Sequence, residues 1–207
     1  MSKLFSFFLA LAVAAPLASA QPSKYQYTEL KPPQPTEAQG KSVEVVEFFW
    51  YGCPHCYNLE PLIEAWTKKL PPDVQFRRIP AVFNPRWAHD AAIFYTFEAM
   101  GVLDKLHKPF FDSIHRDHLR SDDQQAMSEW LQKNGVDAKK FYETMKSFSV
   151  QSKTRRAAQL SAAYKIDGTP AMAVQGRFTV SADQGRSREG MLDTVSYLVD
   201  MLRQGRL

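Results

Sequence analysis

The segment VEVVEFFW at residues 43–50 constrains the fold more than any other part of the sequence. It is apolar on both faces of an extended chain, with Glu44 and Glu47 as the exceptions, so it predicts a central strand that is covered on both sides. A helical pattern follows over residues 53–70, and a second strand pattern follows over residues 74–79. The sequence therefore predicts a β-α-β unit in a parallel or mixed sheet, and we expect its crossover to be right-handed.

The middle of the chain carries apolar residues at helical spacing. Ser121 and Gln124 resemble a capping box, and Asp137 is expected to cap the helix that follows it. We expect this all-helical stretch to interrupt the sheet. The helices are predicted over residues 87–100 and 103–115, from the Ser121 cap through residue 134, over the short segment after Asp137, and over residues 150–164.

Strand patterns return near the end of the chain. Residues 171–174 and 177–180 predict two short strands joined by a hairpin at Gln175-Gly176. Residues 188–202 predict an amphipathic helix, and residues 25–30 alternate weakly, as an edge strand would. The predicted organisation is an α/β domain at residues 21–85 and 158–207, interrupted by a helical insert domain at residues 86–157.

The first twenty residues have the pattern of a secretory signal peptide. Lys3 supplies the positive start, residues 4–15 are almost entirely apolar, and Ala18-Ser19-Ala20 is a small-residue cleavage site. The apolar run is shorter than the roughly 20 residues that a membrane-spanning helix needs, and an uncleaved N-terminal anchor is the alternative. We expect a soluble periplasmic protein whose mature chain starts near Gln21, because no lipid-attachment cysteine follows the cleavage site.

Charge and cysteine content narrow the class of protein. The formal net charge is +4, which is too small and too scattered to indicate a nucleic-acid partner. Cys53 and Cys56 are the only two cysteines, so a framework of several structural disulfides is excluded. A disulfide between residues this close closes almost no loop and would stabilise the fold very little. The pair therefore indicates chemistry.

The motif Cys53-Pro54-His55-Cys56 follows a strand and opens a helix. At a helix N-terminus, unpaired backbone N–H groups and the helix dipole stabilise an anion, so they favour the thiolate of Cys53. Cys56 falls inside the first turn and is expected to be more buried. The position predicts that Cys53 is the low-pKa nucleophile and Cys56 the resolving thiol, and a protonated His55 would favour the thiolate further.

Other uses of two cysteines at this spacing fit less well. A structural zinc site needs two more ligands, and His115 and His118 are the only close histidine pair. A c-type haem needs histidine directly after the second cysteine, but Tyr57 stands there. An inert structural disulfide is the remaining alternative. We expect no metal and no bound cofactor, only a redox-active disulfide between Cys53 and Cys56.

The stretch FFWYGCPHC, with Glu47 six residues before Cys53, resembles the DsbA family of thioredoxin-fold dithiol oxidases of the bacterial periplasm. The signal peptide, the strand before the motif, the helical insert and the later Gly168-Thr169-Pro170 fall in the order of that family. The resemblance therefore covers essentially the whole mature chain. It implies an α/β thioredoxin-like fold, with a central mixed sheet flanked by helices and an inserted all-helical domain.

The resemblance also implies further site residues. Thr169 and Pro170 match the family's site of a cis proline beside the cysteines, where backbone is left free to pair with an extended substrate; an ordinary turn is the alternative. Glu47 matches a buried acid below the active site, for which a proton-relay role is expected. Glu60 matches a second acid, and Arg78 falls where the family tends to carry lysine. A solvent-reaching acid is the alternative for Glu47, and ordinary surface charge is the alternative for Glu60 and Arg78.

Two positions depart from the family pattern. Thr169 stands where the enteric-type oxidases carry valine, and threonine there is more similar to the disulfide isomerase branch. Pro61, inside the active-site helix, is more similar to thioredoxin itself. Both departures leave the redox potential and the partner preference open, but they do not affect the dithiol chemistry.

We predict a periplasmic thiol–disulfide oxidoreductase that works as an oxidase. It would donate its disulfide to reduced or unfolded exported proteins and would be reoxidised by a DsbB-type, quinone-linked membrane oxidase. A monomer is expected. A disulfide isomerase or reductase of the same fold is the nearest alternative, although residues 21–42 are too few for the dimerisation domain that such isomerases usually carry. A non-catalytic chaperone for unfolded exported chains is the alternative from another class.

Overall fold

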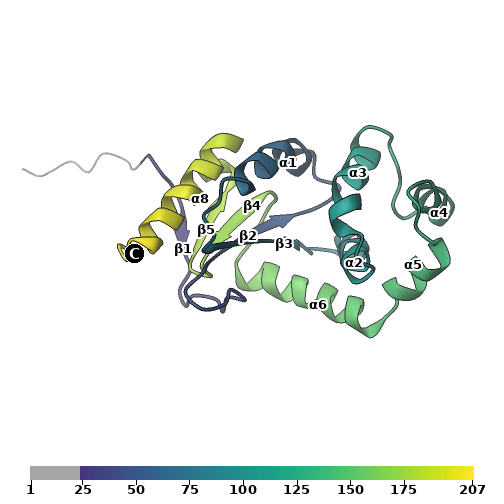
Figure 1. Cartoon of the computed structure of the whole chain (residues 1–207), viewed down its shortest axis with the longest axis horizontal. Coiled ribbons are helices and arrows are strands. Elements are labelled where there is room, and N and C mark those ends of the chain that lie inside the picture. The colour runs from purple at the N-terminus through teal and green to yellow at the C-terminus, as the bar shows by residue number, and fades with distance from the viewer. Residues whose placement is uncertain (1–23) are drawn as a thin grey trace, which may run out of the picture.

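The computed structural model describes residues 24–207, and the signal peptide predicted at residues 1–20 lies outside the described residues. A sheet and the helices that cover it form one end of the molecule, and a group of helices forms the other (Figure 1). Within the described residues the sheet has five strands in the order β1-β5-β4-β2-β3. They are β1 (Thr28–Glu29), β2 (Val43–Phe49), β3 (Val74–Pro80), β4 (Ala171–Val174) and β5 (Phe178–Ser181).

Strand β2 lies inside the sheet, and all seven of its residues are buried. It pairs in parallel with β3, where Glu47 is opposite Arg78, and antiparallel with β4. The prediction of a doubly covered central strand in a mixed sheet is therefore confirmed. The weakly alternating segment near the start is also confirmed as an edge strand, since β1 pairs only with β5.

Helices cover both faces of the sheet. Helices α1 (Pro54–Thr67) and α8 (Arg188–Arg203) lie on one face, and α6 (Phe148–Ala163) lies on the other (Figure 1). Alternate residues of β2 point to opposite faces, so Val45 packs with side chains of α1 and α8, whereas Val46 packs in the core that α6 helps to form. Because both faces are buried, β2 has no room for an exposed side chain.

The helical insert lies between β3 and β4. Its helices match the predicted segments closely, and the α/β thioredoxin-like fold with a helical insert is confirmed. Helix α6 crosses residue 157, where the sequence places the end of the insert, because one continuous helix connects the insert to the sheet. The remaining insert helices are α2 (Pro85–Ala99), α3 (Leu103–His115), α4 (Gln124–Lys133) and α5 (Ala138–Met145).

One predicted helix cap is wrong. Helix α4 is capped by Asp123, whose carboxylate accepts hydrogen bonds from the backbone N–H groups of Gln125 and Ala126. Ser121 donates its hydroxyl to the buried carboxylate of Asp90 at 2.6 Å instead. A buried carboxylate needs hydrogen-bond donors, and this tertiary demand outweighs the local capping pattern.

The hairpin between β4 and β5 is confirmed. Gln175 and Gly176 both have positive φ, at 52° and 61°, as a tight two-residue hairpin requires. A Cβ atom on Gly176 would lie 2.0 Å from the carbonyl oxygen of Gln34, so no side chain fits there. The short helix α7 (Ala182–Gly185), which follows β5, is not predicted by the sequence, because four residues carry no periodicity.

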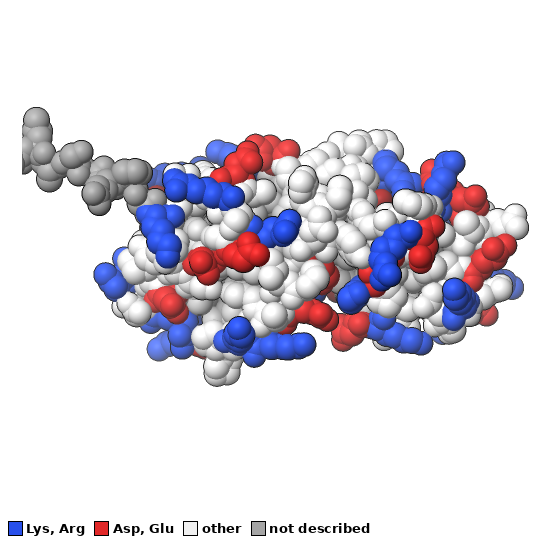
Figure 2. Space-filling model, turned by 90° about the horizontal axis from the view of Figure 1, so that it is seen from above, with Lys and Arg blue, Asp and Glu red and all other residues white. Residues whose placement is uncertain are grey.

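The molecular surface carries charges of both signs. On the face drawn in Figure 2, Lys and Arg side chains alternate with Asp and Glu over both ends of the molecule, and an uncharged area lies near the middle. Within residues 24–207, no helix is long and apolar enough to cross a membrane.

Candidate active site

Cys53 occupies the N-cap position of α1, directly after β2 and its short connection. Its backbone is extended, with φ −86° and ψ 114°, so the side chain turns back onto the first helical turn. The backbone N–H of Cys56 donates a hydrogen bond to Cys53 Sγ at 3.4 Å. Both cysteines are free thiols. Cys53 exposes 6% of its surface, whereas Cys56 exposes none.

The surroundings of the two sulfur atoms shift their pKa values in opposite directions. The pKa of Cys53 is lowered to about 5, chiefly by a hydrogen bond from the Cys56 thiol; burial opposes the shift, and the Thr169 side chain and the backbone N–H groups of Cys56 and His55 add to it. The pKa of Cys56 is raised, first because it is buried and then because Cys53 lies next to it. The motif therefore holds a thiolate and a thiol side by side at neutral pH.

Thr169 and Pro170 lie beside Cys53, although they are far away in the sequence. The peptide bond between them is cis. The carbonyl oxygen of Thr169 lies 3.3 Å from Cys53 Sγ. Pro170 and the exposed His55 line two hollows, of about 180 and 330 Å³, on the surface next to the cysteines. This surface is where an extended chain could reach Cys53.

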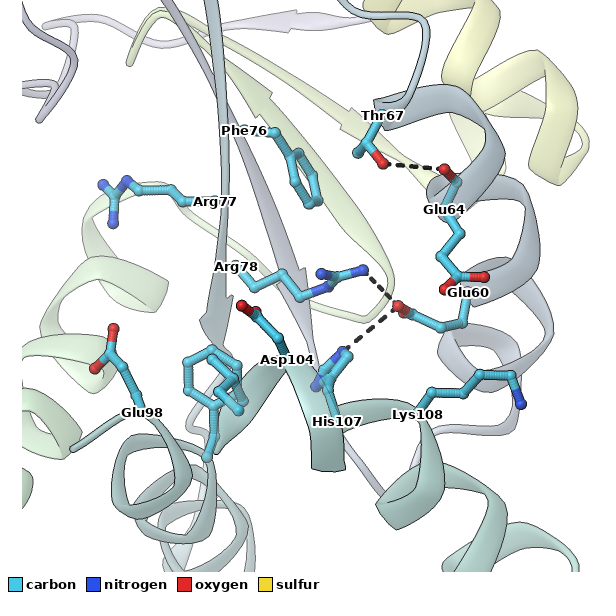
Figure 3. Close-up of a pocket in the computed structure, with 12 residues that line it drawn as sticks. Glu60, Glu64, Thr67, Phe76, Arg77, Arg78, Glu98, Asp104, His107 and Lys108 are labelled. Atoms are coloured by element: carbon cyan, nitrogen blue, oxygen red, sulfur yellow. Dashed lines mark hydrogen bonds and ion pairs between the residues drawn. The ribbon is translucent and has the colours of Figure 1, made fainter. Parts of the chain in front are cut away.

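Glu47, Glu60 and Arg78 come together as one buried ionic cluster. Arg78 lies between the two acids: its Nε donates to Glu47 Oε2 at 3.0 Å, and its Nη2 contacts Glu60 Oε1. Glu47 exposes 1% of its surface and Glu60 exposes 5%. Figure 3 shows Arg78 and His107 both pointing toward the Glu60 carboxylate, at the wall of a cavity of about 410 Å³. The three residues that the sequence singles out as candidate relay groups are thus in direct contact.

The two acids of this cluster have different proton affinities. Burial raises the pKa of Glu47 to about 8; the charge of Arg78 opposes the shift, whereas the charges of Glu60 and Cys53 add to it. Burial also works to raise the pKa of Glu60, but the interactions with His107 and Arg78 outweigh it and lower this pKa. Glu47 is therefore a protonated acid at pH 7, while Glu60 is a carboxylate.

Two residues of the cluster are absent from the sequence prediction. His107 Nδ1 lies 2.9 Å from the hydroxyl oxygen of Tyr51, and His107 Nε2 lies 3.6 Å from Glu60 Oε1. The second distance is longer than a hydrogen bond, so we regard it as an electrostatic contact. A weak signal exists in the sequence, since His107 directly follows Leu106 on a helix whose apolar residues include Phe110 and Phe111. Its partner could not be read from local spacing.

The helical insert fixes the connection between β2 and α1. Trp50 Nε1 donates to Asp90 Oδ2 at 2.7 Å, and the Trp50 ring stacks on Trp87 with 4.3 Å between centroids. His115 Nε2 lies 2.7 Å from the carbonyl oxygen of Tyr51. Side chains of α2 and α3 therefore hold the residues that set the position of Cys53.

The arrangement supports thiol–disulfide exchange. It combines an accessible, low-pKa sulfur, a second sulfur directly below it, and a buried acid whose pKa lies near neutrality. Among the described residues, no group of three or more His, Cys, Asp or Glu side chains lies close enough to hold a metal ion.

Comparison with known proteins agrees with this chemistry. Residues 44–187 match the family described as a DSBA-like thioredoxin domain. "Thiol:disulfide interchange protein DsbA" of Azotobacter vinelandii is 42% identical over 181 residues, which cover 87% of this chain and 84% of that protein. The protein of the same name in Burkholderia cepacia is 38% identical over 212 residues, which cover 100% of both chains. The crystal structure of Pseudomonas aeruginosa DsbA has a TM-score of 0.82 at 37% identity, covering 91% of this chain and 97% of that one.

Proposed function

The chain belongs to the DsbA family of thiol:disulfide interchange proteins, and we propose that it works as an oxidase, which donates the Cys53–Cys56 disulfide to reduced proteins exported to the periplasm. One observation carries this proposal: Cys53 Sγ accepts the Cys56 N–H at the N-terminus of α1 and has a pKa of about 5. A stabilised thiolate favours the reduced form of the enzyme. It therefore makes the disulfide easy to give away.

The size of this effect can be estimated. At pH 7, a pKa of about 5 in place of the usual value near 9 stabilises the reduced form by roughly two pH units, or about 2 to 3 kcal/mol. For a two-electron couple, this raises the reduction potential by on the order of 50 mV. The shift is in the direction that an oxidase needs, because a reductase works best when its thiolate is less stable.

The exchange takes place in two displacements. A substrate thiolate attacks Cys53 Sγ, the bond between the two cysteine sulfurs breaks, and Cys56 leaves with the electron pair. A second substrate thiolate then attacks the substrate sulfur of the mixed disulfide, and Cys53 leaves as a thiolate. The substrate loses two electrons and gains a disulfide, while the enzyme gains two electrons as a thiol–thiolate pair.

Glu47 is proposed to supply the proton that Cys56 needs. A thiolate at a fully buried position is unfavourable, and the pKa of Glu47, about 8, leaves it protonated at pH 7. Transfer of this proton to the Cys56 sulfur turns Glu47 into a carboxylate, which Arg78 contacts directly. Arg78 and Glu60 are proposed to hold Glu47 in place during this transfer.

Thr169, Pro170 and His55 are proposed to bind the substrate. His55 and Pro170 line both hollows, Thr169 lines the larger one, and the Thr169 carbonyl oxygen lies 3.3 Å from Cys53 Sγ. Reoxidation by a DsbB-type, quinone-linked membrane oxidase and action as a monomer are part of the same proposal. Both rest on the family and on the predicted signal peptide.

The oxidase proposal is tested by the reduction potential of the Cys53–Cys56 disulfide, measured in a glutathione buffer. An oxidase is expected to be more oxidising than glutathione, and its active site should be mostly oxidised in periplasmic extracts. A more reducing potential, with an active site found mostly reduced, would favour the isomerase or reductase alternative that Thr169 suggests.

A further inference from the structure

Tyr51 and His107 form a buried polar pair that the exchange chemistry described above does not use. Tyr51 exposes 1% of its surface and His107 exposes 6%. The only hydrogen bond that either side chain makes in the described part of the chain joins the Tyr51 hydroxyl to His107 Nδ1 at 2.9 Å. The aromatic rings of Phe49, Phe94 and Phe111 enclose the imidazole. A polar pair in such a setting is unfavourable unless its geometry serves another group.

The Tyr51 hydroxyl fixes the tautomer of His107. Burial raises the pKa of Tyr51 far above its usual value, so the hydroxyl keeps its proton and is available as a donor. When it donates to Nδ1, the neutral ring carries its own hydrogen on Nε2. That nitrogen lies 3.6 Å from Glu60 Oε1, and Figure 3 shows the ring edge directed at this carboxylate.

The charges around His107 come from three elements. Glu60 faces it from α1, Arg78 from β3, and Asp104 and Lys108 lie on its own helix α3. Burial lowers the pKa of His107, although Glu60 opposes the shift. The ring is therefore neutral at pH 7, and it can direct an N–H dipole at Glu60 without adding a second cation beside Arg78.

The two acids of the cluster compete for Arg78. Two carboxylates that share one buried cation do not both ionise easily, and the acid with more donors keeps the charge. Each acid has one buried oxygen that makes no hydrogen bond, Oε1 of Glu47 and Oε2 of Glu60. Glu47 has Arg78 as its ionic partner. Glu60 has both Arg78 and His107. Among the side chains that lower the pKa of Glu60, His107 contributes most, ahead of Arg78 and Lys108, and the charge of Cys53 adds to the difference by raising the pKa of Glu47.

We propose that Tyr51 and His107 are positioning residues, which hold an N–H dipole on Glu60 so that Glu60 stays ionised and Glu47 becomes the acid that exchanges a proton. The difference in ionisation between the two acids is a property of the resting protein. Only its use in protonating Cys56 rests on the proposed function.

The titration of the two carboxyl groups tests this proposal. Carbon-13 NMR of the glutamate side chains, assigned with Glu47→Gln and Glu60→Gln, gives each midpoint in the reduced full-length protein. In His107→Leu, which removes the N–H, we expect the Glu47 midpoint to fall and the Glu60 midpoint to rise, each by about one pH unit. His107→Gln places an amide N–H near the former Nε2 and should restore most of the original separation.

Two further variants keep the test decisive. Tyr51→Phe frees the ring to take the other tautomer and should bring the midpoints together by a smaller amount, even if His107→Leu does not fold. His89→Gln is the matched control, and it should leave both midpoints unchanged. The His89 ring pairs with the carbonyl oxygen of Ser121 and is not part of the cluster of Glu47, Arg78 and Glu60. Unchanged midpoints in the folded His107→Leu and Tyr51→Phe proteins would overturn the proposal. The oxidase proposal would survive that result, since it is tested separately by the reduction potential.

Discussion

The surroundings of Cys53 and of Cys56 differ although the two residues share one helical turn. Cys53 keeps 6% of its surface exposed, and hydrogen-bond donors from the Cys56 thiol and from backbone N–H groups stabilise its negative charge. Cys56 lies below it, fully buried, above the cluster of Glu47, Arg78 and Glu60. Helix termini stabilise anions, whereas burial stabilises neutral groups. The difference in depth alone therefore gives the two sulfurs different roles.

The largest effect is expected from removing the exposed sulfur. Cys53→Ser should lower the rate of disulfide transfer to a reduced peptide by at least about 1,000-fold, because the atom that forms the mixed disulfide is gone. Cys56→Ser is the matched variant: when it is given a peptide that already carries a disulfide, its Cys53 thiolate should attack that bond, release one peptide thiolate and stay trapped as the mixed disulfide, because no second enzyme sulfur resolves it. Full activity of Cys53→Ser would contradict the assignment and would favour the chaperone alternative.

Replacing the buried carboxyl group of Glu47 is expected to stabilise the protein. The folded pKa of Glu47 is about 8, against 4.5 for an ordinary glutamate, so stability is present below pH 4.5 and is lost as the pH rises toward 8. Glu47→Gln removes this penalty and should raise the free energy of unfolding by about 4 kcal/mol at pH 7.5. Urea unfolding of both proteins at pH 4 and pH 7.5 measures it. An equal difference at the two pH values would rule out the raised pKa.

The low pKa of Cys53 predicts that the stability of the protein depends on its redox state. The folded pKa of Cys53 is lowered, so the stabilisation of the reduced protein is present in full above pH 9, is partial at pH 7, and is lost as the pH falls through about 5. At pH 7 the reduced protein should be more stable than the oxidised protein by about 2 kcal/mol. Denaturant unfolding of the two forms between pH 4 and pH 8 checks this, and a constant difference would speak against it.

The smallest effect is expected from Thr169. The Thr169 side chain contributes to the low pKa of Cys53. A well-formed hydrogen bond to a charged group is worth about 1.5 kcal/mol or more, which corresponds to roughly one pKa unit. Thr169→Val should therefore raise the pKa of Cys53 by roughly one unit or less. Thr169→Ser keeps the hydroxyl and is the control. If the valine and serine variants titrate alike, the hydroxyl has no part in stabilising the thiolate.

The sequence predicts the elements that depend on local patterns. The apolar run of β2, the helix that opens at Cys53 and the hairpin at Gln175-Gly176 are all present where the patterns indicate. The predicted cap of α4 is wrong because the Ser121 hydroxyl donates its hydrogen bond to Asp90, which is distant in the sequence. Local spacing carries no information about such partners.

The candidate site also contains a part that local sequence patterns predict and a part that depends on the packing of distant elements. The position of Cys53 at a helix N-terminus follows from the strand and helix patterns alone. The ionic cluster requires β2, β3 and α1 to pack together, and the contribution of His107 requires α3 to lie against them. The pairing of Tyr51 with His107 is therefore a property of the assembled fold, and no single segment of the sequence indicates it.

The pH dependence of the Cys53 thiolate tests the central claim most directly. Absorbance of the reduced protein at 240 nm, together with the rate of alkylation by iodoacetamide, gives the titration midpoint, and Cys53→Ser identifies the signal. The structure predicts a midpoint near pH 5 that disappears in Cys53→Ser. A midpoint near pH 8.5, that of an ordinary cysteine, would contradict the stabilised thiolate and the proposed oxidase function that rests on it.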